Sequence, residues 1–380
     1  MQPAALEIAA AGPMRPPADA VVGASRRREE QGFDAIWWPD HMLHWFPQAI
    51  WTPDLVPQAL RQPSPHVWFD PFPVVAAAGA ATERIRLAIG VTDMVRRHPA
   101  SLAQTALTLD HLTGGRFMLG VGTGEAINLA PFGLSNRRPL GRLEEGLQIM
   151  RLLFATEGPV DFAGDHFTLD GAVMGLGAIG ATPPPIWMAA HRPRGLDIAG
   201  RLADGWLPLG TTPEDYRDGL ARVRAAAEAA GRGTDAIRPG VYLRVVLADD
   251  RRQAEAAIDA SLLMRFIALT RPSERYEAFG ATHPIGPGSA GITDFLPTRQ
   301  DRAEALALAE AVPAEVVRDT VIHGAPDEVA AQVGAFVAAG ARHVQIVNMT
   351  PLADPALAAA SEEHLGGVVA ALRAAAGPDA

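Results

Sequence analysis

Eight short apolar runs recur along the chain, and amphipathic stretches of helical period separate most of them. The runs lack the strict alternation of apolar and polar residues that marks a strand exposed on one face, so they are interpreted as parallel strands covered on both faces. The predicted strands span residues 5–9, 35–39, 85–92, 117–122, 186–190, 205–209, 240–247 and 343–348. The predicted helices span residues 18–31, 100–112, 142–154, 194–202, 213–230 and 326–339.

Strands and helices in alternation indicate βαβ units and a parallel sheet. The number of strands favours a (β/α)8 TIM barrel over an open doubly wound sheet, although both topologies share the local pattern. We predict one barrel domain over residues 1–380, with insertions near 44–72, 158–185 and 262–313, the second containing a possible hairpin around 162–167. Long insertions after barrel strands usually form the roof of a pocket.

Composition narrows the partners that a chain of this kind can have. A net charge of -10 argues against nucleic acid, whose phosphates would be repelled. The chain has no cysteine, which excludes disulfides, thiolate metal sites and a cysteine nucleophile and fits a reducing cytoplasm, where we expect the protein. The sequence shows no apolar run long enough for a membrane span and no secretory signal pattern. The expected partner is a small molecule.

The run Gly120-Val121-Gly122-Thr123-Gly124-Glu125 is the most informative local motif. Alternate glycines let a flat or phosphorylated ligand approach the backbone closely, and a carboxylate just beyond them is placed to handle a proton. The glycine spacing differs from the dinucleotide fingerprint, and no acid follows a next strand at the expected distance, so an NAD site is not predicted. The run predicts an enzyme with a large planar cofactor.

Four polar groups follow predicted strands, at the end where a barrel holds its active site. They are Asp40-His41, the segment 90–93, Glu125 with Asn128, and the segment 189–192. His41 changes charge near neutral pH, which suits proton transfer, although a histidine there also serves as a structural hydrogen-bonding group. Glu125 could instead cap the following helix. A metal site at His41 and His44 is not predicted, because no acidic third ligand lies at helical spacing.

Taken together, these motifs resemble the bacterial luciferase-like superfamily, and within it the branch that uses the deazaflavin coenzyme F420. That branch includes glucose-6-phosphate dehydrogenases and methylene-tetrahydromethanopterin reductases, and the resemblance is strongest to the phthiodiolone dimycocerosates ketoreductases. The motifs that carry it are Trp38-Pro39-Asp40-His41, Ile89-Gly90-Val91-Thr92, Arg97-His98-Pro99, the run 119–125, Ile186-Trp187-Met188-Ala189-Ala190-His191-Arg192-Pro193-Arg194, Ala203-Asp204-Gly205-Trp206, His283-Pro284-Ile285-Gly286 and Val312-Pro313-Ala314.

The resemblance implies a TIM barrel with the deazaflavin ring over the strand ends. His41 and Glu125 match the catalytic pair, and a cis peptide bond between Gly90 and Val91 is expected behind the ring. The remaining residues assigned to the cofactor are Asp40, Thr92, Thr123, Gly124, Asn128, Ala190, His191, Arg192 and Arg194. Among these, Arg192 and Arg194 could bind the phosphate or the acidic tail of the cofactor through their guanidinium groups, as could Arg96 and Arg97. Equally, these arginines could lie on solvated loops without binding it.

The implied reaction is hydride transfer between the deazaflavin and a carbonyl or alcohol, with His41 or Glu125 handling the proton. The lysines that hold a sugar phosphate have no match, so an apolar ketone or alcohol is expected. Trp45, Trp68, Met264 and Phe266 are predicted to line the substrate pocket or else to anchor the insertions. The family suggests a homodimer. Two alternatives stay open: an FMN-dependent monooxygenase of the same fold, and a non-catalytic cofactor-binding protein.

Overall fold

The protein is described by a computed structural model that covers residues 5–376. Eight parallel strands close into a barrel, in the order β9-β11-β1-β2-β3-β4-β7-β8, and β8 pairs with β9 to complete the ring. These strands are β1 (Glu7–Ala11), β2 (Ala35–Trp38), β3 (Arg86–Asp93), β4 (Phe117–Gly122), β7 (Ile186–Met188), β8 (Gly205–Trp206), β9 (Arg238–Leu247) and β11 (His343–Asn348). Because all of them run parallel, their carboxyl ends meet at one end of the barrel.

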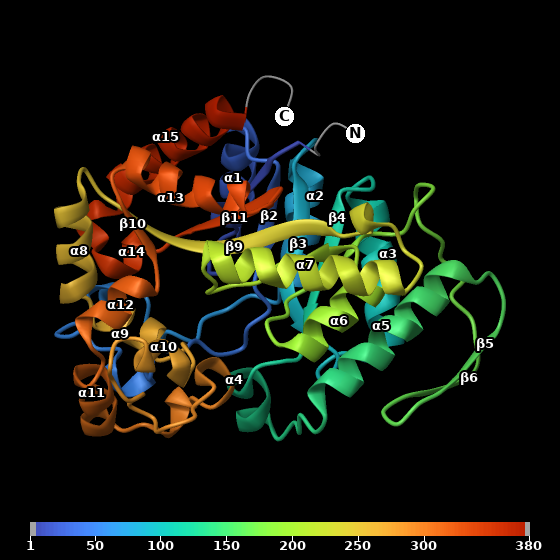
Figure 1. Cartoon of the computed structure of the whole chain (residues 1–380), viewed down its shortest axis with the longest axis horizontal. Helices are drawn as coiled ribbons and strands as arrows, with labels where there is room; N and C mark the ends of the chain where they lie inside the picture. The colour runs from blue at the N-terminus through green and yellow to red at the C-terminus, as the bar shows by residue number, and fades with distance from the viewer. Residues whose placement is uncertain (1–4, 377–380) are drawn as a thin grey trace.

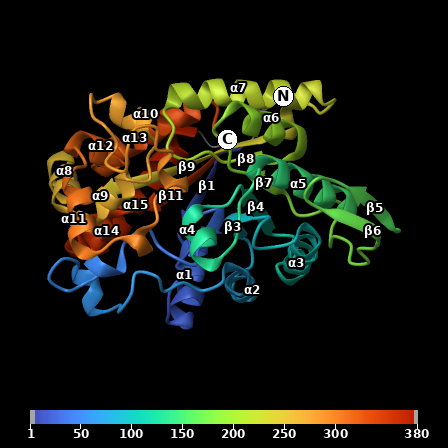
Figure 2. The same ribbon diagram turned by 90° about the horizontal axis from the view of Figure 1, so that it is seen from below.

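Helices surround the strands, as Figures 1 and 2 show from two directions. The principal ones are α1 (Ala18–Glu30), α2 (Pro71–Ala81), α3 (Pro99–Leu112), α5 (Pro139–Ala155), α6 (Pro193–Leu202), α7 (Pro213–Ala229), α13 (Pro326–Ala338) and α15 (Ala358–Ala376). Shorter ones are α4 (Ala126–Leu129), α8 (Arg251–Ala260), α9 (Leu262–Ala268), α10 (Ser273–Glu277), α11 (Arg302–Glu310), α12 (Ala314–Asp319) and α14 (Thr350–Ala353). The predicted (β/α)8 TIM barrel is confirmed.

Some boundaries and elements differ from the sequence prediction. The strand predicted over 205–209 ends at Trp206, because Pro208 has no N–H to donate, and only an isolated bridge from Leu209 continues the pairing. The strand β10 (Ile322–Gly324) was missed because a three-residue strand has no detectable period. The helices α2 and α15 are rich in alanine, so their amphipathic pattern is weak. Within residues 5–376, no helix has the length and apolar character that crossing a membrane requires.

The interior of the barrel is filled by large aromatic side chains. Trp37 and Trp187 are fully buried and meet edge to face, with ring centroids 5.5 Å apart. The indole N–H of Trp37 donates to Nε2 of His343 at 2.8 Å, and His343 Nδ1 lies 2.8 Å from a carboxylate oxygen of Glu7. These side chains fill the barrel interior beneath the carboxyl ends of the strands.

The three predicted insertions are structured differently. The second contains the antiparallel hairpin of β5 (Val160–Ala163) and β6 (Thr168–Ala172), as predicted, and Figure 1 shows it projecting away from the barrel. The first and third insertions pack against each other in a second apolar core. Met264 and Phe266 are fully buried in this core, so they anchor the third insertion. Their predicted role in lining the substrate pocket is therefore corrected.

Candidate active site

A cavity of about 550 Å³ opens at the carboxyl ends of the strands. Its walls come from segments that are distant in sequence, including the ends of β2, β3 and β4 and the inward faces of β9 and β11. The predicted site residues that line it are Asp40, His41, Trp45, Trp68, Gly90, Val91, Thr92, Thr123, Gly124, Glu125, Asn128 and His191. The structure therefore brings most of the residues singled out in the sequence to one place.

Asn128 connects His41 with Glu125. Its Oδ1 accepts hydrogen bonds from the amides of Met42 and Leu43, at 2.8 and 3.3 Å, which directs its Nδ2 toward the other two side chains. That Nδ2 lies 3.0 Å from Nδ1 of His41 and 3.4 Å from Oε2 of Glu125. Because Nδ2 is a donor, His41 Nδ1 must be the acceptor, and the ring proton belongs on Nε2. Asn128 thus fixes both the orientation and the tautomer of His41.

The environment shifts the two titratable groups in opposite directions. Burial raises the pKa of Glu125 to about 7, even though the charges of Arg244 and Arg96 oppose the change. Burial, together with the positive charge of Arg96, lowers the pKa of His41 to about 3. Near neutral pH, His41 is therefore uncharged, and Glu125 exists in both protonation states. A carboxyl group whose pKa lies near the working pH can both donate and accept a proton, as general acid–base catalysis requires.

A buried ionic network lies beside His41 and Glu125. The Arg96 guanidinium lies between Asp40 and Asp93, with nitrogen–oxygen distances of 3.1 and 2.6 Å. Asp40 also accepts a hydrogen bond of 2.6 Å from the hydroxyl of Thr92. Arg97 lies 3.5 Å from Asp40 through its Nε and 3.1 Å from Asp70 through a terminal nitrogen. The two arginines considered as candidates for the cofactor phosphate are thus already paired with carboxylates of the protein.

The glycine run has a partly different role from the one predicted. A Cβ atom added at Gly120 would lie 2.4 Å from the carbonyl oxygen of Ile89, and one added at Gly122 would lie 2.8 Å from a methyl group of Val91. Both glycines therefore make room for atoms of the neighbouring strand β3. The cis peptide bond between Gly90 and Val91, implied by the resemblance, is confirmed. The backbone from Gly122 to Gly124 does line the cavity, as predicted.

Aromatic rings surround His41. Trp45 meets its imidazole edge to face and Trp68 lies tilted against it, each with a centroid distance of 5.2 Å. His44 stacks on Phe46 with a centroid distance of 3.8 Å and also lines the cavity. The cavity therefore combines a largely apolar wall with a few polar groups near His41, which is typical of a small-molecule site.

The segment after β7 only partly meets the expectation. His191 lines the cavity, whereas Ala190, Arg192 and Arg194 do not. Ala190 is buried, and its carbonyl accepts a hydrogen bond from the indole of Trp206. Arg192 is exposed and pairs with Glu274 at 2.8 Å, while Arg194 pairs with Glu144 at 3.5 Å. The structure therefore places none of these three residues on the cavity wall, and the two arginine side chains reach Glu274 and Glu144.

Sequence reasoning missed two arginines that line the cavity, Arg15 and Arg244. Arg244 occupies a strand position between Leu243 and Val245, and a charged residue inside an otherwise apolar buried strand was the available signal. Arg15 lies on the loop after β1, with its guanidinium carbon 5.5 Å from the ring centroid of Trp68. Burial lowers the pKa of Arg15.

Comparison with known proteins identifies relatives over most of the chain. A family model described as luciferase-like monooxygenase matches residues 4–343. A phthiodiolone/phenolphthiodiolone dimycocerosates ketoreductase of Mycobacterium tuberculosis is 34% identical over 330 residues, which cover 86% of this chain and 86% of the relative. A putative coenzyme F420-dependent oxidoreductase of the same species is 32% identical over 295 residues, covering 71% of this chain and 81% of the relative.

Solved structures agree with the fold. An F420-dependent secondary alcohol dehydrogenase in complex with an F420-acetone adduct superposes with a TM-score of 0.74 and 21% identity, over 97% of this chain and 99% of the other. The oxygenating constituent of 3,6-diketocamphane monooxygenase from Pseudomonas putida, in complex with FMN, gives a TM-score of 0.62 and 19% identity, over 95% and 97% of the two chains. At these identities the likeness concerns the fold alone.

Proposed function

The chain belongs to the luciferase-like monooxygenase family and is an oxidoreductase, and from this premise we propose that it transfers a hydride between coenzyme F420 and the carbonyl or alcohol carbon of an apolar substrate. The observation that carries the proposal is the pair of Glu125, with a pKa of about 7, and uncharged His41, joined through Asn128 at the cavity wall. A reaction that forms an alkoxide needs a proton donor of this kind.

The cavity suits a planar deazaflavin. The backbone at Gly122 and Gly124 lines the cavity at the end of β4, and Val91 adds an apolar side chain to the same lining. Asp40 and Thr92 supply polar atoms to that lining. When bound, a reduced deazaflavin supplies a hydride to the substrate carbon. We propose that Asp40, Gly90, Val91, Thr92, Thr123, Gly124, Asn128 and His191 contact the cofactor.

The chain's own residues would then handle the proton. His41 Nε2–H is free to donate a hydrogen bond to the substrate oxygen, since Asn128 occupies Nδ1. Because His41 stays uncharged at neutral pH, Glu125 in its protonated form is the acid that supplies the proton during ketone reduction. In the reverse reaction, its carboxylate accepts the proton of the alcohol. Trp45 and Trp68 pack against the His41 ring and help to fix its position.

An apolar substrate follows from the character of the wall. The apolar residues that line the cavity include Trp45, Trp68, Ile267, Ile292 and Leu352. The similarity to a ketoreductase over most of the chain supports the same class of substrate. We further propose that the protein acts in the cytoplasm as a homodimer, as expected for this family. Size-exclusion chromatography with light scattering measures the mass of the assembly. A monomer would contradict the proposed homodimer.

Turnover with a panel of ketones tests the proposal. We expect reduced coenzyme F420, mixed with the protein and apolar methyl ketones of increasing length, to be oxidised at a rate proportional to enzyme concentration, as followed by absorbance. A protein-free mixture and a variant with His41→Ala are the controls. If the protein binds the coenzyme but oxidises it with none of the ketones, the ketoreductase assignment is wrong, while the fold and cofactor assignments stand.

A further inference from the structure

The Arg244 side chain is a buried cation that no carboxylate of the described residues contacts, although its charge acts on nearby Glu125. It is only 7% exposed, yet it lines the cavity. Within residues 5–376, no Asp or Glu oxygen lies within 4.0 Å of its nitrogens, and its N–H groups make no hydrogen bond to protein. A guanidinium group cannot lose its charge in a protein, and an unpaired buried charge is costly. This cation is therefore placed to receive an anion from outside the chain.

The rings beside Arg244 hold it in position without using its donors. Its guanidinium carbon lies 5.6 Å from the centroid of Trp45 and 5.9 Å from that of Tyr242. Cation–π contacts of this kind stabilise the charge over the ring faces. They leave the planar fork of N–H groups available for the two oxygens of a carboxylate, the geometry that guanidinium matches best.

The position of Arg244 in the barrel favours the substrate as the source of the anion. The proposed cofactor floor lies on β3 and β4, whereas Arg244 lies on β9, which in the order of the closed sheet is separated from β4 by β7 and β8. Arg244 contacts the ring of Trp45, and Trp45 in turn contacts His41. The open guanidinium therefore lies near the proton-handling pair, where the substrate binds.

We propose that Arg244 binds a carboxylate of the substrate, so that the preferred substrate is an apolar ketone or alcohol that carries an acidic group away from the reacting carbon. This inference rests on the proposed function for its reaction, but the binding itself requires no turnover. It therefore permits a test on the chain without cofactor, in which failure of the anion site and failure of the oxidoreductase assignment are distinguishable.

The probes are octanoate and octanamide, which have the same chain length and differ in charge. Calorimetric titration of the cofactor-free protein is expected to show octanoate binding about tenfold more tightly or better, which corresponds to ~1.4 kcal/mol. In Arg244→Met, which keeps the length of the side chain but removes the charge, this preference is expected to vanish. Arg244→Lys is expected to retain part of it, because a lysine keeps the charge but loses the fork.

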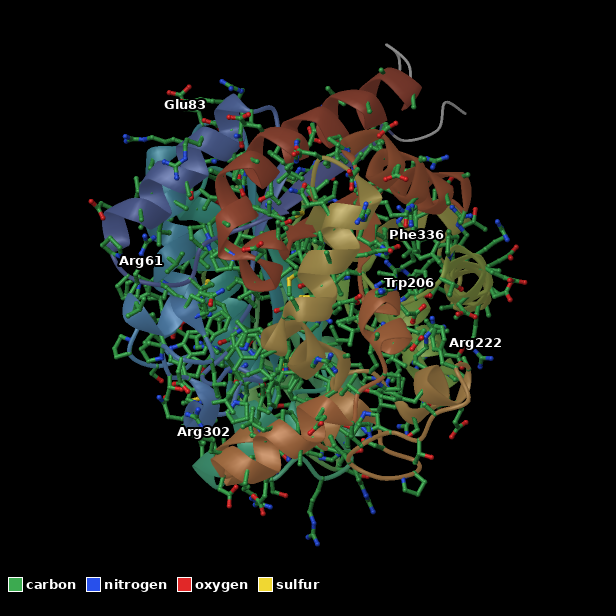
Figure 3. All side chains as sticks on the ribbon, turned by 90° about the vertical axis from the view of Figure 1, so that its left-hand side faces the viewer. Arg61, Glu83, Trp206, Arg222, Arg302 and Phe336 are labelled. Carbon is green, nitrogen blue, oxygen red and sulfur yellow. The ribbon has the colours of Figure 1, made fainter. Side chains whose placement is uncertain are left out.

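Two further variants test whether the preference for octanoate depends on Arg244 specifically. Arg222→Met removes an exposed arginine that pairs with Asp197 at the molecular surface, where Figure 3 labels it, and should leave the preference unchanged. Arg15→Met removes another arginine that lines the cavity and should also leave the preference largely intact. Equal binding of both probes to the wild-type protein, or a preference that survives in Arg244→Met, would overturn the proposal. The wild-type comparison needs no variant to fold.

A last experiment shows whether the anion bound by Arg244 comes from the substrate or from the cofactor. Octanoate should bind with the same preference when the protein is saturated with oxidised coenzyme F420. If the coenzyme displaces octanoate, Arg244 belongs to the phosphate or acidic tail of the cofactor, and the proposal is wrong. A protein that binds octanoate through Arg244 but never binds the coenzyme would retain the anion site and lose the proposed function.

Discussion

Replacing Glu125 by glutamine is expected to lower kcat for ketone reduction by roughly 10²–10⁴-fold, the usual contribution of a positioned general acid. Glutamine keeps the size of the side chain and can still accept the hydrogen bond from Asn128, so the cavity should keep its shape. What it loses is the transferable proton. Affinity for the cofactor is expected to stay close to that of the wild type, because Glu125 lies on the proton-transfer side of the site. Steady-state kinetics and a cofactor titration measure the two effects separately.

The same variant has a distinctive pH signature. Because the pKa of Glu125 is raised to about 7, its acidic form is lost as pH rises through that value, and kcat/KM for reduction should fall above it. Alcohol oxidation needs the carboxylate and should rise over the same range. Both limbs should be absent in Glu125→Gln. Glu277→Gln, which removes an exposed carboxylate on α10, is the matched control and should preserve both limbs. An unchanged rate and profile in Glu125→Gln would contradict the assigned role.

Replacing Arg96 by methionine is expected to lower the free energy of unfolding by about 3–5 kcal/mol, the range found when one partner of a buried ion pair is removed. The Arg96 side chain is 11% exposed, and those of Asp40 and Asp93 are 4% and 2% exposed. Burial alone would lower the pKa of Arg96, but the two carboxylates outweigh it and raise the pKa. Methionine keeps the apolar stem but leaves Asp93 buried without its cation, and Asp40 keeps only its longer contact of 3.5 Å with Arg97.

Urea unfolding followed by circular dichroism measures this loss. Arg222→Met is the matched control, because Arg222 pairs with Asp197 in a solvent-exposed position and its removal should leave the unfolding midpoint nearly unchanged. If both variants unfolded at the same urea concentration as the wild type, the Arg96 network would not be the support of the site that its burial indicates. A loss of catalysis without a loss of stability would give Arg96 a role in the reaction instead.

Most of the site residues that the sequence predicted well follow strand ends, and Trp45 and Trp68 come from the first insertion. Asp40, Thr92 and Glu125 follow or close apolar runs that are individually recognisable, and parallel pairing in a closed sheet brings such positions together whatever their separation in sequence. The fold and the position of the site could therefore be derived from periodicity, and the resemblance supplied the roles. The hydrogen bond between Asn128 and His41 could not be derived from the sequence, since it depends on a side-chain rotamer.

The errors arose where side-chain direction decides the outcome. Arg192 and Arg194 are long enough to reach the cavity or the surface, and nearby Glu274 and Glu144 draw them outward. Gly120 resembles a ligand-binding glycine, but the atoms that approach it belong to Ile89 and Val91. In each case, the residue type was recognised correctly, but the atoms that contact the residue were not predicted.

Arg244 illustrates the opposite error, because the prediction concentrated on loops after strands and passed over a charged residue within a strand. A strand position points either into the barrel or toward the helices, and the sequence shows the charge but not the direction. Met264 and Phe266 were equally ambiguous, since large apolar residues in an insertion serve both as pocket walls and as core. Packing of the first insertion against the third decided that question.

Binding of the two candidate cofactors tests the central claim most directly. The purified protein is titrated with oxidised coenzyme F420 and, separately, with FMN, and the quenching of tryptophan fluorescence is followed, since Trp37, Trp45 and Trp68 line the cavity. Saturable micromolar binding of coenzyme F420, which FMN does not displace, is the predicted result. Micromolar binding of FMN with no binding of coenzyme F420 would contradict the account and assign the chain to flavin-dependent oxygen chemistry.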